Sequence, residues 1–399
     1  MLVVSCFEGT YLSGERAYWL AWSQIKGVGP MSLHRLQQHF GNLTDAWAAK
    51  PADLQQVNGF GKQTIETVIG ERSCLNPEQF LEEHQKKNPC FWTPADTDYP
   101  RLLLEIPNPP PVLYYRGNVD LKENHGITPT VGIVGTRSPS EYGKRWTRKI
   151  STALAKRGFT IVSGLAAGID TEAHAGCLDS GGRTLAIFGT GVDIVYPAAN
   201  KKLAERVLEQ GLAISEYPAG TKPYKTHFPQ RNRIIAGLSR AVLVMEAPQK
   251  SGALITAYQA NDFCRDVYVL TARLDDERSF GCLELLSKGA HPILPSNDRF
   301  LSEERLLEML GAMPKLDSAQ LDSAQLNSPQ QLSLFPENPP PILEPDLAKV
   351  LEAIPFESTV FDLIVERAGL APGEVSSALL QLELLELVSQ LPGMRYQRC

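Results

Sequence analysis

The stretch TVGIVGTRSPSEYGKRWTRKISTALAKRGFTIVSG, residues 130–164, sets the pattern for the middle of the chain. It begins and ends with a short apolar run, and a segment with helical periodicity lies between them. Further apolar runs follow (TLAIFG, LAISE, AVLVMEA and DVYVLTA), with a second periodic segment, NKKLAERVLEQG. Continuous apolar strands joined by helices are typical of a parallel sheet covered on both faces. The sequence therefore predicts an extended Rossmann-like, doubly wound α/β domain over residues 128–312.

Residues 1–88 are predicted to form a helical domain. Two of its turns, in IKGVGPMSLHRLQQHFG and VNGFGKQTIETVIG, share the order Gly, apolar residue, Gly, amphipathic helix. This order resembles the helix-hairpin-helix motif of SAM-like domains, in which backbone N–H groups meet a phosphate. A purely structural helical domain fits the same pattern. Residues 89–127 are rich in proline and are predicted to be a connector that contains the extended segment VLYYRG.

Residues 313–342 are predicted to be a disordered linker, because the repeated LDSAQ and its variant LNSPQ cannot bury enough apolar surface to fold. Gln331, Leu332, Leu334 and Phe335 interrupt this polar stretch. They are similar to the short peptide that many bacterial replication and repair proteins insert into the sliding clamp, so the clamp is a candidate partner. The alternative is that this peptide docks on a surface of its own chain.

The net charge of −6 over 399 residues hides a basic middle. Residues 128–300 contain 22 Lys and Arg against 16 Asp and Glu, whereas the rest of the chain is acidic. A basic region suits a polyanion, although a solvated lysine-rich face gives the same count. No apolar run approaches the roughly 18 residues of a membrane span, and Glu8 is unlike a signal peptide, so a cytoplasmic protein without a membrane partner is predicted. The scattered cysteines, without Cys-x-x-Cys, predict reduced thiols and no metal site.

The loops at the carboxyl ends of the predicted strands are rich in glycine and small hydroxyl residues: GTRSPSEYG, SGLAAGIDTEAH, GTGVDIVYP and KSGALITA. Ligands of doubly wound sheets bind at this edge, where glycine admits close approach and helix N-termini offer N–H groups. The nearby KTHFPQRNRIIAG places Lys225, Arg231 and Arg233 beside no acidic residue. Such cations are rarely buried without a partner. The sequence therefore predicts a phosphate pocket.

Common cofactor signatures are absent. GFGKQT lacks the Ser or Thr that follows the P-loop lysine, and Gly189-Thr-Gly191 is followed by Ile194 where the dinucleotide fingerprint has glycine. No cofactor is predicted. Asp170, His174 and Glu246 are candidates for catalysis, but no nucleophile, base and orienting group come together in the sequence. A binding protein is preferred to an enzyme.

In order and spacing, VGIVGTR, SGLAAGIDTEAH, GTGVDIVYPAAN, HFPQRNRIIAGLSRAVLVMEA and SGALITA resemble the DprA/Smf family of DNA-processing proteins. The resemblance implies a homodimer that binds single-stranded DNA and loads RecA recombinase during natural transformation, with a winged helix in residues 343–399. The family is not known as an enzyme. The alternative is a lysine-decarboxylase-like phosphoribohydrolase, but this chain lacks the Pro-Gly-Gly-x-Gly-Thr loop of that family.

The resemblance assigns the Gly-Thr-Arg arginine to Arg137, the lysine before Phe-Pro to Lys225 and the family's Arg-Asn-Arg to residues 231–233. Phe228 is a candidate for base stacking, since aromatic platforms bind single strands without sequence preference. The predicted DNA-binding residues are Gly135, Thr136, Arg137, Ser163, Gly164, Gly168, Lys225, Phe228, Arg231, Asn232, Arg233, Ser251 and Gly252. The chain departs from the family at LTARLDD, residues 270–276, where a Pro-Gly turn is usual. The predicted recognition helix carries Glu374 and Glu383 but no Lys or Arg, which favours a structural or protein-contact role for the winged helix.

Overall fold

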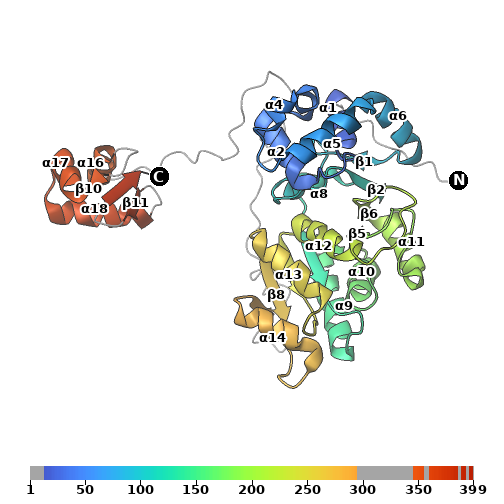
Figure 1. The fold of residues 1–399 in the computed structure, drawn as a ribbon. Coiled ribbons are helices and arrows are strands. Elements are labelled where there is room, and N and C mark those ends of the chain that lie inside the picture. Colours follow the sequence, from blue (N-terminus) through green and yellow to red (C-terminus); the bar gives the residue numbers. More distant parts are fainter. Residues whose placement is uncertain (1–12, 294–344, 355–358, 385–387, 392–394, 399) are drawn as a thin grey trace. The chain divides into compact units, whose positions relative to one another are not determined.

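The computed structural model describes residues 13–293, 345–354, 359–384, 388–391 and 395–398 (Figure 1). The chain divides into two compact units, residues 1–317 and 318–399. The repeats and the clamp-like peptide of Gln331, Leu332, Leu334 and Phe335 lie outside the described residues, so the linker and its candidate partner stay predictions.

The first unit is built on a nine-stranded sheet with the order β1-β2-β6-β5-β4-β3-β7-β8-β9. Every predicted apolar run forms a strand, and strands β3 to β8 pair in parallel, as does β9 (His291–Ile293) on β8. The predicted strands are β3 (Thr130–Val134), β4 (Thr160–Ser163), β5 (Thr184–Ile187), β6 (Leu212–Ser215), β7 (Ala241–Val244) and β8 (Asp266–Leu270). Strands β4, β5 and β6 follow one another on one side of β3, and β7, β8 and β9 follow on its other side. The direction in which strands are added therefore reverses between β3 and β7. The predicted doubly wound α/β sheet is confirmed.

The proline-rich segment does more than connect. Its VLYYRG piece forms β2 (Leu113–Gly117), which pairs antiparallel with β6, and β1 (Phe91–Trp92) pairs antiparallel with β2. The rings of Trp92 and Tyr115 stack with centroids 3.9 Å apart. Two short helices, α7 (Arg101–Leu104) and α8 (Leu121–Asn124), complete the segment. These residues therefore form one edge of the sheet.

Helices cover both faces of the sheet because alternate residues of each strand are apolar on both sides. Ile161 packs toward α9 and α10, whereas Val162, the next residue, packs toward α12 and α13. The crossover helices are α9 (Glu141–Lys156), α10 (Ile169–Asp179), α11 (Lys201–Gln210), α12 (His227–Leu238), α13 (Gly252–Asp262) and α14 (Phe280–Ser287). Helices α9 to α11 cover one face and α12 to α14 the other (Figure 1).

The N-terminal helices form the predicted helical domain around a core that includes Trp19, Trp22 and Leu36. Its helices are α1 (Ser13–Trp22), α2 (Pro30–Phe40), α3 (Leu43–Ala48), α4 (Pro51–Leu54), α5 (Lys62–Ser73) and α6 (Pro77–Lys87). The two predicted glycine turns precede α2 and α5, and Gly27 and Gly59 adopt positive φ there. Phosphate binding by these turns stays a prediction.

The second unit is a winged helix. Helices α16 (Pro345–Ala353), α17 (Phe361–Ala368) and α18 (Pro372–Leu384) pack with a small antiparallel sheet. The strands, in the order β10-β12-β11, are β10 (Thr359–Val360), β12 (Arg395–Arg398) and β11 (Val388–Leu391). This arrangement confirms the predicted fold of the C-terminal segment.

The cysteine prediction is wrong at one position. Cys90 is in a disulfide, whereas Cys74, Cys177, Cys264 and Cys282 are free thiols. The described residues contain no group of His, Cys, Asp and Glu that could hold a metal ion. No helix in the described part of the chain is long and apolar enough to cross a membrane.

Candidate functional site

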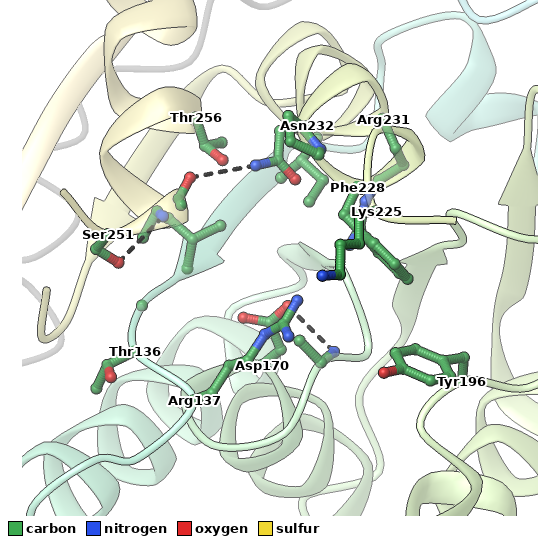
Figure 2. A pocket seen from close by; sticks show the side chains of 17 residues that line it. Thr136, Arg137, Asp170, Tyr196, Lys225, Phe228, Arg231, Asn232, Ser251 and Thr256 are labelled. Atoms are coloured by element: carbon green, nitrogen blue, oxygen red, sulfur yellow. Dashed lines mark hydrogen bonds between the residues drawn. The ribbon is translucent and has the colours of Figure 1, made fainter. Parts of the chain in front are cut away.

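A pocket of about 600 Å³ opens at the carboxyl ends of β3 and β7, where the strand order reverses (Figure 2). Its walls are the loop after β3, the start of α10, the start of α12 and the start of α13. A second pocket of about 210 Å³ shares Arg137, Tyr196, Phe228 and Arg231 with it. The reversal of a doubly wound sheet is the usual place for a ligand, because the loops on its two sides run apart there.

Most of the predicted site residues line these pockets. They come from four separate loops, which the fold brings to one edge of the sheet. The lining includes Gly135, Thr136, Arg137, Gly164, Lys225, Phe228, Arg231, Asn232, Ser251 and Gly252. Ser163, Gly168 and Arg233 do not line either pocket.

Arg233 is a correction to the predicted site. Its guanidinium is 2.7 Å from Glu216, and the two side chains are only 8% and 14% exposed. Helical residues two positions apart point in different directions, so Arg231 and Arg233 cannot both face the pocket. Glu216 directly follows β6 and lies 17 residues from Arg233 along the chain. The expectation that Arg233 has no acidic partner and faces a ligand is therefore wrong.

Arg231 lines the pocket, and only 3% of its surface is exposed. It donates to the backbone oxygen of Ile187. Burial lowers its pKa to about 10, and the nearby Asp170 carboxylate opposes that shift. Arg231 therefore stays charged at neutral pH, but this charge is already partly compensated by Asp170.

Asp170 fixes the loop that follows β4. Its Oδ2 accepts hydrogen bonds from the N–H groups of Gly164 (3.0 Å) and Ala166 (3.3 Å). Burial raises the pKa of Asp170, while Arg231 and these hydrogen bonds act in the opposite direction. The N-cap of α10 is Gly168, so Asp170 lies in the first turn of the helix.

Gly168 and Ser163 support elements next to the pocket without lining it. Gly168 has φ +85°, and a Cβ there would overlap the backbone oxygen of Thr136 and lie 2.7 Å from the carbonyl carbon of Arg137. Ile169 donates its N–H to the same Thr136 oxygen, at 3.1 Å. The Ser163 hydroxyl is buried and donates to the oxygen of Ile133, at 2.6 Å. Gly168 thus supports the Gly-Thr-Arg loop and Ser163 holds the end of β3, and neither residue lines the pocket.

Arg137 and Lys225 are the exposed cations of the pocket. Neither forms an ion pair with any residue that the structure describes. Figure 2 shows both side chains pointing into the same space, Arg137 from the loop after β3 and Lys225 from the segment before α12. Two like charges that converge, neither in an ion pair with a described residue, make a site for an anion, although the Asp170 carboxylate lines the same pocket.

Aromatic rings form the adjoining wall. The rings of Tyr196 and Phe228 have centroids 5.4 Å apart and are tilted by 38°. The guanidinium carbon of Arg137 lies 5.8 Å from the centroid of the Phe228 ring. Tyr196 is 44% exposed and was not among the predicted site residues, although it lies in the GTGVDIVYP loop. An aromatic residue in a loop at the ligand edge is the signal that could have found it.

The pocket contains no catalytic set among the described residues. The imidazole of His174 is fully buried, with Nδ1 2.7 Å from the Thr184 hydroxyl, and burial lowers its pKa to about 3. Glu246 accepts from the hydroxyl of Ser140 (2.6 Å) and from its N–H (3.0 Å) at the start of α9. Of the three catalytic candidates, Asp170 alone lines the pocket.

Comparison with known proteins agrees with this architecture. The model of a family described as DNA recombination-mediator protein A matches residues 90–304, and that of the DprA winged helix domain matches residues 336–394. Protein Smf of Synechocystis sp. is 56% identical over 402 residues, which cover 97% of this chain and 99% of that protein. The chain belongs to the DprA/Smf family.

DNA processing protein DprA of Streptococcus pneumoniae is 41% identical over 236 residues, which cover 56% of this chain and 82% of that protein. The X-ray structure of DprA from the same species matches with a TM-score of 0.61 and 34% identity, covering 69% of this chain and 94% of that one. The DprA/Smf match at residues 90–304 contains the pocket and the edge strands β1 and β2.

Replacement of Gly168 by alanine tests how the Gly-Thr-Arg loop of this DprA/Smf chain is supported. The new Cβ would meet the backbone of Thr136 and Arg137, and the positive φ adds about 1–3 kcal/mol of strain. We expect a lower free energy of unfolding and a displaced Arg137. The matched control is Gly181→Ala, where φ is +74° but no atom lies within 4 Å of the new Cβ. If urea unfolding shows that both variants lose the same free energy of unfolding, the result contradicts this packing.

The buried His174 predicts a pH-dependent stability. Its pKa is about 3 in the folded chain and 6.5 in the unfolded chain, so between these values only the unfolded state binds the proton. The stability that neutral His174 provides is therefore complete above pH 6.5 and is lost as the pH falls toward 3. The slope is at most about 1.4 kcal/mol per pH unit. We expect His174→Gln to flatten this slope between pH 6.5 and 4.5 in urea titrations, whereas exposed His39→Gln leaves it unchanged.

Proposed function

We propose that this chain binds single-stranded DNA in the pocket at the β3/β7 reversal and acts as a cytoplasmic recombination mediator during DNA uptake and transformation. The observation that carries the proposal is the convergence of Arg137 and Lys225, neither paired with a described residue, beside the rings of Phe228 and Tyr196. Cations that meet phosphates and rings that stack on bases are the two elements of single-strand binding.

The phosphate side of the pocket also uses backbone groups. Helix α13 begins at Gly252 with Ser251 as its N-cap, and both residues line the pocket. Gly135 and Thr136, from the loop after β3, line the same pocket. The N-terminus of a helix carries free N–H groups and the positive end of the helix dipole, so it adds to the attraction that Arg137 and Lys225 exert on a phosphate.

The base side of the pocket favours a single strand. Stacking on Phe228 or Tyr196 requires a base whose face is open, and pairing within a duplex keeps base faces stacked on one another. Duplex readers instead insert a helix or ribbon into a groove, usually with basic side chains. The third helix of the winged helix, α18, carries Glu374 and Glu383 but no Lys or Arg. These features support single-strand binding by the first unit.

We also infer a homodimer and RecA as partners, and a binding role instead of catalysis. Family membership supports the two partners. The pocket supports the binding role, because no His, Cys or Glu is among its described lining residues and its one acid, Asp170, accepts backbone hydrogen bonds and lies near Arg231. The sliding clamp stays a further candidate partner through residues 331–335. Stimulation of RecA filament formation on oligonucleotides by the full chain would test the mediator role.

Salt-dependent binding tests the pocket as the DNA site. Loss of one phosphate-contacting cation flattens the slope of log K against log salt by about 0.7 for a single strand. We expect Arg137→Ala and Lys225→Ala each to weaken oligo-dT binding by the full chain and to reduce this slope. Lys156→Ala removes an exposed charge at the far end of α9 and is the matched control. If the Arg137→Ala, Lys225→Ala double variant keeps the affinity and slope of the wild type, the site lies elsewhere.

Preference for single strands is a separate test. We expect tighter binding of oligo-dT than of a blunt duplex of equal length at matched salt, because only the single strand offers open base faces to Phe228 and Tyr196. Fluorescence anisotropy titrations of the two labelled DNAs give the ratio. Equal affinity would show that backbone charge alone drives binding, and the aromatic wall would then have no part in it.

A further inference from the structure

A second group of aromatic rings lies just outside the pocket, before and at the start of α12. The rings of Tyr217 and His227 stack with centroids 4.0 Å apart and planes 19° apart. The ring of Tyr224 lies 5.7 Å from that of His227 and is tilted by 57°. The Tyr217 hydroxyl donates to the side-chain oxygen of Gln230, at 3.1 Å. Tyr217 and His227 therefore form a fixed pair, and Tyr224 stands at its side.

Tyr224 differs from its neighbours because its side chain is 63% exposed. A single exposed ring is common on protein surfaces and needs no explanation by itself. Here, however, two exposed lysines lie close to Tyr224 in the sequence, Lys222 two residues before it and Lys225 directly after it, and neither forms an ion pair with a residue of the described chain. An open ring between two cations is the pattern that receives a base together with its phosphates.

This second aromatic group is adjacent in sequence to residues that line the pocket. Lys225, the neighbour of Tyr224, lines the pocket, and so does Phe228, the neighbour of His227. Two aromatic groups thus lie next to one another: Tyr196 and Phe228 within the pocket, and the Tyr217–His227 pair with Tyr224 outside it. A strand that leaves the pocket past Lys225 meets Tyr224 next.

We propose that Tyr224 is a second stacking platform, which receives the base of a nucleotide next to the one held in the pocket, with Lys222 near its phosphate. This inference rests on the proposed function, since it extends the path of the same strand. The occupant is single-stranded nucleic acid because the flanking charges are both positive and the pocket that the path continues offers Arg137 and Lys225 to phosphates. An isolated apolar peptide would gain nothing from the two lysines.

A length series of oligo-dT tests the platform with the full chain. A dinucleotide fills the pocket alone, whereas dT12 reaches beyond it. We expect Tyr224→Ala to weaken dT12 binding about 5- to 150-fold, the usual effect of removing one stacking ring. Binding of dT2, measured by competition against labelled dT12, is expected to be unchanged. Tyr224→Phe keeps the ring and is expected to bind both as the wild type does.

Tyr142→Ala is the positional control, because Tyr142 is a 41% exposed tyrosine on α9 that does not line the pocket. If Tyr224→Ala keeps the wild-type affinity for dT12 while Arg137→Ala weakens binding, the platform is overturned and the pocket remains the DNA site. Equal weakening of dT2 and dT12 by Tyr224→Ala would also overturn it, since the ring would then act on the pocket itself. If neither Arg137→Ala nor Tyr224→Ala affects binding, the proposed function fails together with the platform.

Discussion

The buried guanidinium of Arg231 ties together the elements that build the pocket. It comes from α12, donates to the end of β5 through Ile187, and lies beside Asp170 at the start of α10. Gly164, at the end of β4, has no space for a Cβ because Arg231 fills it. Both groups are buried and oppositely charged, so loss of either one would leave the other charge without compensation. Arg231 and Asp170 therefore hold together α12, the end of β5 and the start of α10. The pocket is thus shaped by contacts within the chain itself.

This constraint separates two kinds of cation that look alike in the sequence. Arg231 and Arg233 are buried and already have Asp170 and Glu216 as partners, so their role is to position α12 against the sheet. Arg137 and Lys225 are exposed, and their mutual repulsion is reduced when an anion enters between them. Gly168 packs against the backbone of the loop that carries Arg137, so this loop is held in place and Arg137 lines the pocket.

The sequence reveals the parts of this structure that depend on local patterns. The parallel strands are visible as continuous apolar runs, and glycines mark the loops at their carboxyl ends. Strand β1 is hidden in the sequence, because it has only two residues. The extended segment that forms β2 is visible, but prolines precede it and its pairing with β6 is not visible. The pairing of Arg233 with Glu216 depends on the tertiary arrangement of β6 and α12, which no local window contains. Tyr196 shows the same limit: its loop was recognisable, but only the fold brings its ring against Phe228.

The distribution of charge along the chain explains how an acidic protein can hold a polyanion. Phosphate binding depends on the local release of counterions, so it follows the few cations that contact the strand and not the net charge of −6. Beyond a Debye length of about 8–10 Å, acidic surfaces are largely screened at physiological salt. The acidic segments on either side of the basic middle then weaken DNA binding outside the pocket more than they weaken DNA binding in the pocket. Under the proposed function, the absence of Lys and Arg from α18 helps to confine DNA to the proposed path through Arg137, Lys225 and the aromatic rings beside them.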